Sequence, residues 1–463
     1  MLFSSVPFLF YFLPAVLLVY FLVPKRAKNG VLLLSSLVFY GWGEPRYLPV
    51  MLVSILQGYI FGRLIERFRD TRRAKLFLVL SVLLSLGTLA YFKYADFMIA
   101  NLNALTGLSA PLLRLALPVG ISFYTFQILS YTVDVYRGTV PAQRNFIDLA
   151  AYIAMFPQLI AGPIVRYSDI AVQLKTREHS ISEAASGARR FILGLAKKIL
   201  LANLLGELVS SFRASADLSV LYYWLGAIAF TLQIYYDFSG YSDMAIGLGR
   251  IFGFRFPENF QYPYLSGSIT EFWRRWHISL GSWFRDYLYI PLGGNRKGSA
   301  RQLLNILLVW LATGLWHGAA WNFVLWGLLY AVLLTAEKLF LLRWLKRLPA
   351  VLRHLYALAL VTVSWTLFAF TEISKGAAWC KAMLSGVLFD SSSLYLLLTY
   401  GPMLAICALA ATPLGKRFYE KLGTRLGQRA LTVVDCGGLA CVLVMAAAYL
   451  VSGSYNPFIY FRF

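Results

Sequence analysis

The feature that most constrains this chain is a series of apolar runs, each long enough to cross a lipid bilayer. Examples are residues 6–23, 76–92, 355–370 and 431–451. A membrane-spanning helix needs about 20 mostly apolar residues, and by that measure the chain holds about a dozen spans. Inside a bilayer only helices and closed barrels satisfy every backbone hydrogen bond. The sequence therefore predicts an all-α polytopic membrane protein with almost no sheet.

The charged residues support the same class. The chain of 463 residues is 59% hydrophobic and 14% charged, whereas soluble domains carry about 25% charged residues. A net charge of +22 could indicate a nucleic-acid partner in a soluble protein. Here the basic residues lie in short loops between apolar runs, which is the positive-inside pattern. We therefore expect membrane lipids, and no nucleic acid, as partners.

The basic loops also orient the chain. Residues 25–28 and 63–75 are predicted to be cytoplasmic, which places both ends of the chain outside. The first apolar run follows no basic residues and precedes no small-residue cleavage site, so it is interpreted as a first span and not as a signal peptide. The whole chain, 1–463, is expected to be one integral membrane domain. Within it, residues 250–301 are predicted to form a cytoplasmic-side re-entrant or interfacial segment.

Two other stretches are not predicted to span. Residues 147–165 carry two prolines and a glycine and have basic residues at both ends, which favours a re-entrant segment. Residues 96–117 are weakly apolar and contain helix breakers, so we place them at the outer interface. The four cysteines form no Cys-x-x-Cys pair, and neither a zinc site nor a disulfide framework is indicated.

Two of the four histidines, His277 and His317, are the leading candidates for chemistry. His317 ends a hydrophobic helix, where a polar side chain needs a partner and marks a functional site by default. It could bond a neighbouring helix, hold a metal together with His277, or act as a general base. The metal reading is disfavoured because no companion ligand has the right spacing. Gly314 and Gly318 are expected to leave room for a substrate chain.

Residues 271–290 are predicted to form one helix with an aromatic face and an arginine-rich face. One reading is an interfacial helix with snorkelling arginines. The other is a cytoplasmic surface for a nucleotide-containing donor, because arginine matches phosphate and indole stacks on a base. The candidate donor-binding residues in and around this segment are Trp273, Arg274, Arg275, Trp276, Arg285, Asp286, Trp316 and Asn322.

A third group is polar and lies in apolar surroundings. Asp237 and Asp243 flank two serines at helical spacing, and the favoured reading is interhelical hydrogen bonding rather than direct catalysis. The predicted supporting network around the site consists of Gln127, Arg166, Asp237, Ser239, Tyr241 and Asp243.

Several motifs together resemble the membrane-bound O-acyltransferase family, in its bacterial alginate O-acetylase branch. They are FWRRWHISL at 272–280, WFRDYLYIPLGGN at 283–295, YDFSGYSD at 236–243, FPQLIAGPIVR at 156–166, LWHG at 315–318 and NPFIYFRF at 456–463. The resemblance covers nearly the whole chain.

The resemblance implies a bundle of about 11 to 12 transmembrane helices with re-entrant and interfacial helices. It maps the family's invariant histidine onto His317 and a second polar position onto His277. It implies acetyl transfer from cytoplasmic acetyl-CoA, with no permanently bound cofactor or metal. The acceptor would be an extracytoplasmic polysaccharide such as alginate, reached with an SGNH-type acetyltransferase or esterase partner at a bacterial cytoplasmic (inner) membrane.

Three alternatives stay open on the sequence. A D-alanyltransferase relative would take its acyl group from the phosphopantetheine of an acyl carrier protein and pass it to a cell-wall polymer. A transporter or flippase would explain the spans but predicts inverted repeats, which the sequence lacks. A lipid-dependent glycosyltransferase would need an acidic residue in an early external loop, where Glu44 is the only candidate.

Overall fold

The computed structural model describes residues 1–214, 219–453 and 459. Within these ranges the chain forms helices and no β-strand, apart from two isolated bridges that join Ser219 to Val387 and Phe260 to Trp276. The all-α prediction is confirmed. The chain divides into two compact units, Met1–Phe191 with Ser242–Pro257, and Ile192–Tyr241 with Glu258–Phe463. Each unit is described by itself.

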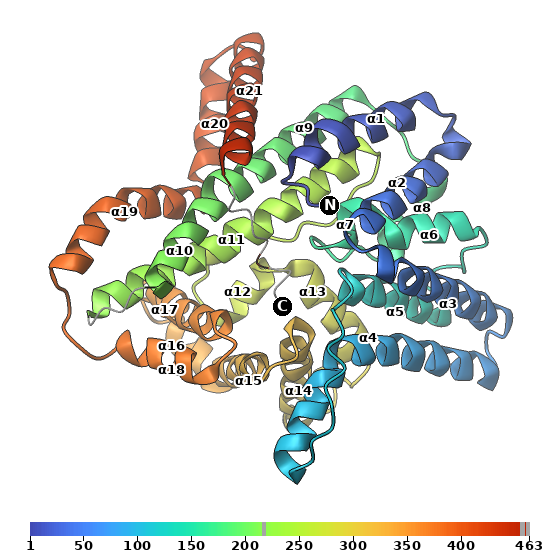
Figure 1. The fold of residues 1–463 in the computed structure, drawn as a ribbon, viewed down its shortest axis with the longest axis horizontal. Helices are drawn as coiled ribbons and strands as arrows, with labels where there is room; N and C mark the ends of the chain where they lie inside the picture. Colours follow the sequence, from blue (N-terminus) through green and yellow to red (C-terminus); the bar gives the residue numbers. More distant parts are fainter. Residues whose placement is uncertain (215–218, 454–458, 460–463) are drawn as a thin grey trace. The chain divides into compact units, whose positions relative to one another are not determined.

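The first unit consists mainly of helices from the N-terminal part of the chain (Figure 1). They are α1 (Leu13–Leu22), α2 (Lys28–Gly43), α3 (Leu48–Arg67), α4 (Arg72–Thr106), α5 (Ile121–Arg137), α6 (Phe146–Ala154), α7 (Phe156–Leu159), α8 (Tyr167–Lys175) and most of α9 (Ile181–Ala196). The helices α3, α4 and α5 pack against one another.

The helix α4 shows where residues 96–117 are broken, while their place at the outer interface stays a prediction. It runs without interruption to Thr106 and ends where Gly107 adopts a left-handed conformation with φ 73°. That conformation suits glycine because it has no Cβ. Only the residues after Gly107 leave the helix. The Asp96 carboxylate accepts hydrogen bonds from the backbone N–H groups of Leu113 and Arg114, at 2.6 and 2.9 Å.

The predicted break within residues 147–165 is confirmed. Asn145 caps α6, since its side chain accepts a hydrogen bond from the backbone N–H of Ile147 at 2.9 Å. The helix stops at Met155, a short α7 follows, and Gly162 has a positive φ of 105°. Irregular backbone of this kind is tolerated at membrane depth only where protein or a wet cavity surrounds it. The re-entrant path itself stays a prediction.

The second unit contains the two candidate histidines. Its helices are α10 (Leu204–Ala214), most of α11 (Val220–Ile251), α12 (Ile269–Arg275), α13 (Ile278–Phe284), α14 (Ser299–His317), α15 (Trp321–Ala336), α16 (Leu342–Leu345), α17 (Ala350–Ala369), α18 (Ile373–Ala382), α19 (Ser391–Ala410), α20 (Leu414–Arg425) and α21 (Gln428–Ser452). π-Helical turns at Lys197–Asn203, Arg285–Tyr289 and Glu337–Leu341 join some of them.

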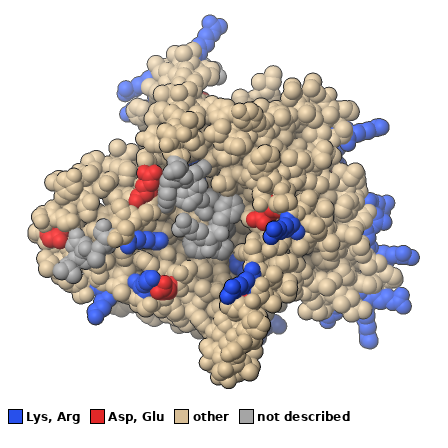
Figure 2. All heavy atoms as spheres, viewed as in Figure 1, with Lys and Arg blue, Asp and Glu red and all other residues tan. Residues whose placement is uncertain are grey.

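Six described helices are long and apolar enough to cross a membrane, which confirms a multi-pass membrane protein. They span Pro45–Arg67, Arg72–Thr106, Trp321–Leu345, Ala350–Ala369, Ser391–Ala410 and Arg429–Ser452. Large apolar side chains such as Leu105 and Leu398 are 86% and 78% exposed, as lipid contact requires. Figure 2 shows that uncharged residues cover most of the face in view. The larger number of about 11 to 12 spans stays a prediction, since charged or broken segments do not meet this criterion.

The helices α14 and α15 form a closely packed hairpin in the second unit (Figure 1). A Cβ added to Gly314 would overlap the carbonyl oxygen of Phe323, and one added to Gly327 would overlap the carbonyl oxygen of Trp310. Small residues let helix backbones approach closely in membrane proteins. This hairpin positions His317 at the C-terminal end of α14.

Candidate active site

The segment that carries His277 is broken, and the prediction of one helix over residues 271–290 is wrong. α12 ends at Arg275, α13 begins at Ile278, and His277 between them has φ 44° and ψ 54°. Few non-glycine residues adopt this left-handed conformation, which costs of order 1–3 kcal/mol and clusters at functional sites. The helix breaks where an extended segment pairs with it. The Gln261 N–H donates a hydrogen bond, at 2.9 Å, to the carbonyl of Arg275, the last residue of α12.

The side chain that holds His277 is Asn259, which the sequence analysis missed. Asn259 Oδ1 lies 3.0 Å from His277 Nδ1 and also accepts hydrogen bonds from the Ser279 hydroxyl at 2.9 Å and the Ser279 N–H at 3.4 Å. A backbone N–H can only donate, so the atom facing both residues is the Asn259 oxygen. The imidazole must then donate through Nδ1, which leaves a lone pair on Nε2.

His277 is thus set up as a neutral base. Its Nε2 has no hydrogen-bond partner among the residues that the structure describes. The ring is 2% exposed and packs edge-on against Phe238, with centroids 4.7 Å apart. Burial, and to a lesser degree the nearby His317, holds the pKa of His277 well below its usual range. At neutral pH the side chain can accept a proton or a hydrogen bond through Nε2.

His317 ends the hydrophobic helix α14, as predicted, and its ring lies among aromatic rings. Its side chain is 7% exposed. The ring centroid lies 5.2 Å from that of Trp326 on α15 and 5.3 Å from that of Phe368 on α17. Trp316 lies beside both histidines, and its ring centroid is 5.1 Å from that of His317 and 5.9 Å from that of His277. The structure therefore brings the two predicted histidines into one neighbourhood.

The glycines beside His317 have a different role from the one expected. Gly314 packs against the α15 backbone, and a Cβ at Gly318 would overlap the Phe323 ring. The space above both glycines is therefore filled by protein. They allow α14 and α15 to pack, and the expectation that they leave room for a substrate chain is wrong.

His277 lines a pocket of about 510 Å³. Its walls come from α12, α13, the π-helical turn that follows, and α14. They are lined by Thr270, Trp273, Arg274, His277, Ile278, Leu280, Gly281, Ser282, Phe284, Arg285, Tyr289, Val309, Trp310, Thr313 and Leu334. The volume matches that of small-molecule sites, which are mostly apolar with a few convergent polar groups. Thr313, one helical turn before His317, brings the pocket wall towards that histidine.

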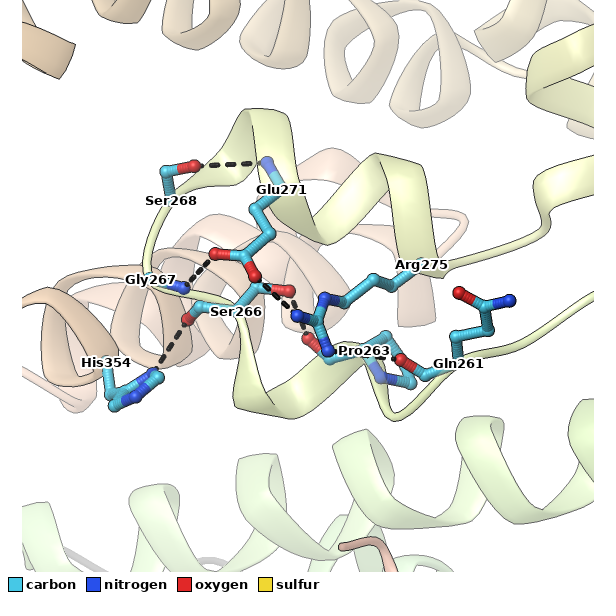
Figure 3. A network of polar contacts seen from close by, with 8 residues as sticks. All are labelled: Gln261, Pro263, Ser266, Gly267, Ser268, Glu271, Arg275 and His354. Carbon is cyan, nitrogen blue, oxygen red and sulfur yellow. Dashed lines mark hydrogen bonds and ion pairs between the residues drawn. The ribbon is translucent and has the colours of Figure 1, made fainter. Parts of the chain in front are cut away.

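The predicted arginines separate into two roles. Arg274 and Arg285 line the pocket, and Arg274 makes no ion pair with any described residue. Arg285 forms a bidentate ion pair with Asp286, with N–O distances of 2.7 and 3.1 Å. Arg275 instead binds Glu271 at 2.7 Å, and Glu271 also accepts the Gly267 N–H at 2.9 Å (Figure 3). Arg275 therefore holds the segment before α12 and does not line the pocket.

The predicted tryptophans and the amide also lie around the two histidines. Trp273 lines the pocket and contacts Trp310, with ring centroids 4.6 Å apart. Trp276 is 3% exposed and packs against Trp365 at 4.8 Å, so it belongs to the core of this unit. Asn322 is 4% exposed in the first turn of α15, and neither amide atom has a hydrogen-bond partner among the described residues.

The predicted polar network is distributed over both units. In the second unit Asp237 binds Lys198 at 2.6 Å and accepts the Ile459 N–H at 2.9 Å, while Ser239 and Tyr241 are buried. In the first unit, Asp243 binds Arg190 at 2.8 Å.

Two members of the predicted network belong wholly to the first unit. Gln127 is 2% exposed within α5. Arg166 caps α8, and its backbone N–H donates to Asp169 at 2.9 Å. A metal site is not indicated either, since no group of three or more His, Cys, Asp or Glu residues in the described ranges could hold an ion.

Known proteins are similar to this chain in sequence. The sequence profile of the MBOAT, membrane-bound O-acyltransferase, family matches residues 136–375. The chain is 38% identical over its full length to a protein of Azotobacter vinelandii named probable alginate O-acetylase AlgI, all of which is covered. It is 34% identical to the peptidoglycan O-acetyltransferase of Helicobacter pylori, over 84% of this chain and 81% of that protein. The teichoic acid D-alanyltransferase of Bacillus subtilis is 28% identical over 48% of this chain and 59% of that protein.

Proposed function

Because this chain belongs to the membrane-bound O-acyltransferase family, we propose that it is an O-acetyltransferase that moves acetyl groups from cytoplasmic acetyl-CoA to an extracytoplasmic polysaccharide. The enzyme class, acyltransferase, follows from the family, which sets the transporter reading aside. Similarity to proteins named probable alginate O-acetylase and peptidoglycan O-acetyltransferase, over 84% or more of this chain, supports acetyl as the acyl group. Similarity to the D-alanyltransferase covers about half of the chain, so the carrier-protein donor is the second candidate.

The observation that carries the proposal is the pocket beside His277. A thioester donor needs cations for its phosphates and an apolar channel for its pantetheine arm. Arg274, which makes no ion pair with any described residue, supplies positive charge at the pocket, with Arg285 and its partner Asp286 beside it. Trp273 and Trp310 supply an apolar wall. Arginine forks bind phosphate strongly, and indole faces stack on planar groups. No bound group is required beforehand, and acetyl-CoA enters as a substrate.

The chemistry proposed for His317 is general-base catalysis. The acceptor hydroxyl oxygen attacks the thioester carbonyl carbon while His317 takes the hydroxyl proton. The new C–O bond forms, the C–S bond breaks, and the proton passes to the departing thiolate, so that CoA leaves as a thiol. In a second version the imidazole nitrogen attacks first and carries the acetyl group to the hydroxyl. Both versions place the reaction at the end of α14.

The proposed role of His277 is to orient the thioester or to take part in proton transfer. Its Nε2 lone pair can accept a hydrogen bond from the pantetheine amide or a proton from the reacting hydroxyl. The Asn259 hydrogen bond fixes both the tautomer and the direction of the ring. Positioned acid–base groups of this kind contribute about 10²–10⁴-fold to rate.

The proposed setting is a bacterial cytoplasmic membrane, with the acceptor reached from outside. Alginate or a wall polymer would serve as the final acceptor, and a membrane-anchored or periplasmic SGNH-type partner would complete the transfer. The named acceptors of the relatives differ, alginate in one and peptidoglycan in another, so the polymer must be found by experiment.

The test uses purified protein in nanodiscs with acetyl-labelled acetyl-CoA and extracted cell-surface polymers. Wild type, His317→Ala and His354→Ala are compared at equal folding, judged by gel filtration. His354 is the matched control because its Nδ1 forms a hydrogen bond with the Ser266 carbonyl, at 3.2 Å, and it does not line the pocket (Figure 3). We expect CoA release by wild type and His354→Ala, and a loss of about 10²–10⁴-fold for His317→Ala.

Equal rates in all three proteins would overturn the role of His317. A parallel reaction with D-alanyl-loaded carrier protein separates the two donors. Turnover there and none with acetyl-CoA would overturn acetyl-CoA as the donor and favour the second candidate.

A further inference from the structure

Three basic side chains converge on one tyrosine in the first unit, at the junction of α1 and α2. Arg177 donates its Nε–H to the Tyr20 hydroxyl at 2.8 Å, and His179 Nε2 lies 2.9 Å from the same oxygen. The hydroxyl itself donates to the Phe252 carbonyl at 2.8 Å. Lys28 Nζ lies over the Tyr20 ring, 4.4 Å from its centroid. The tyrosine thereby holds the three side chains together.

Lys28 is the unusual member of this cluster. It is 8% exposed, yet it makes no hydrogen bond or ion pair with any described residue. Its ammonium lies over two aromatic rings, those of Tyr20 and Phe21, the second at 5.0 Å. Buried lysines are normally paired, because desolvation of a lone charge is costly. The cation–π contacts offset part of that cost.

No carboxylate among the described residues forms an ion pair with Lys28 or Arg177. Arg177 donates a hydrogen bond to the Asn29 side-chain oxygen at 2.6 Å. The Asn29 amide nitrogen in turn donates to the Asp148 carboxylate at 2.7 Å. The second terminal nitrogen of Arg177 is buried and has no hydrogen-bond partner among the described residues. Burial, together with repulsion from Arg177 and Lys25, lowers the pKa of Lys28. An anion placed here would relieve this repulsion.

The surroundings of the cluster are those of a membrane interface. At the end of α1, Leu18, Phe21 and Leu22 are 64%, 47% and 75% exposed. The loop that carries Arg177 and His179 is flanked by two apolar residues, Val172 at 73% and Ile181 at 90% exposed. Apolar side chains next to a basic cluster at a span end are the arrangement that binds anionic lipids on the cytoplasmic side.

We propose that Lys28 and Arg177 form a binding site for the phosphate group of an anionic phospholipid, whose acyl chains lie along the exposed side of α1. Lys28 would bind the phosphate oxygens with charge-assisted hydrogen bonds, and Arg177, held by Tyr20 and Asn29, would supply a second positive charge. His179 and Tyr20 hold Arg177 in place. The site is separate from the pocket beside His277, which belongs to the other unit.

The test is native mass spectrometry of the whole protein released from nanodiscs that contain equal phosphatidylglycerol and phosphatidylcholine. Lys28→Gln removes the central charge, and Lys75→Gln is the matched control in another basic loop, since Lys75 is exposed. We expect wild type and Lys75→Gln to retain phosphatidylglycerol over phosphatidylcholine. Lys28→Gln should lower retention about fivefold, the factor for one basic side chain near an anionic surface. A parallel arm offers inorganic phosphate in place of lipid.

Equal retention of phosphatidylglycerol by all three proteins would overturn the proposal. Displacement of the bound lipid by millimolar phosphate would overturn a lipid as the source of the phosphate group and favour a small free anion. Should Lys28→Gln fail to fold, the wild-type protein alone decides. Preference for phosphatidylglycerol that falls with added salt supports a charged site, and equal retention of both lipids at low salt overturns it.

Discussion

Asn259 Oδ1 lies 3.0 Å from Nδ1 of His277, although the two residues are 18 positions apart. The same oxygen binds the hydroxyl of Ser279, so one amide fixes both the broken helix and the histidine ring. The imidazole is thereby held as the tautomer with a lone pair on Nε2. Pre-organised side chains of this kind decide how well a site works, because a loosely held base loses rate.

The first prediction is that Asn259→Ala lowers turnover by at least about tenfold while the protein remains folded. The ring of His277 would lose its orientation, and its Nδ1 would lose a buried partner. The measurement is CoA release from acetyl-CoA, with kcat and KM determined separately. Asn305→Ala is the control, because Asn305 is fully buried and binds the Gly294 carbonyl at 2.9 Å without touching a histidine. A similar drop in kcat for both variants would contradict a specific role for Asn259.

The second prediction concerns the charge on His277. Burial disfavours the protonated imidazolium, and a charged His317 would disfavour it further, so the pKa is lowered. The neutral form should therefore persist as pH falls below about 6.5, the ordinary value for histidine. The chain has four histidines, so NMR of histidine-labelled protein, assigned by single substitutions, can follow each one. A His277 midpoint at or above 6.5 would contradict the buried, neutral state.

Much of the fold could be predicted because its signals are local. Apolar runs of sufficient length indicate spans, and the hydrophobic helix that ends at His317 is α14. The break at His277 could not be predicted, since the aromatic spacing of residues 271–290 fits one helix equally well. The information that ends α12 lies in residues 259–261, whose backbone pairs with it. Local periodicity does not report such a contact.

Within the candidate site, too, the roles of some residues could not be predicted from the sequence. Arg274 and Arg275 are neighbours in sequence, yet one lines the pocket and the other binds Glu271. Their side chains leave the helix in different directions, which composition does not reveal. The prediction that Gly314 leaves room for a substrate is wrong for a similar reason, because the sequence does not distinguish a glycine at a helix crossing from one beside a substrate.

The third prediction separates these two arginines. Arg274→Gln should raise KM for acetyl-CoA about tenfold, the effect of losing one hydrogen bond to a charged group. Arg275→Gln should leave KM within about twofold, since its partner is a carboxylate of the same segment. Steady-state kinetics at two salt concentrations provides the measurement. The salt dependence of KM should weaken in Arg274→Gln and not in Arg275→Gln. Equal KM effects in both variants would contradict the assignment of Arg274 to the donor pocket.

The last prediction concerns the anchor of α12, the buried side chain of Glu337. This carboxylate is fully buried and accepts hydrogen bonds from the N–H groups of Ile269 and Thr270, at 2.7 and 2.8 Å, and from the Thr270 hydroxyl at 2.6 Å. Tyr356 donates a further bond at 3.1 Å. These contacts connect the first turn of α12 to the C-terminal end of α15. They thereby fix where His277 lies relative to α14.

Glu337→Ala would leave several buried donors without an acceptor, each at a cost of about 1–3 kcal/mol. We expect a clear fall in the thermal unfolding midpoint in detergent, and a smaller fall for Glu337→Gln, which keeps one acceptor oxygen. Glu372→Ala is the matched control, because Glu372 pairs with Lys375 at the surface, where both side chains are more than half exposed. An unfolding midpoint for Glu337→Ala as high as that of Glu372→Ala would show that α12 is held in place by its aromatic packing alone.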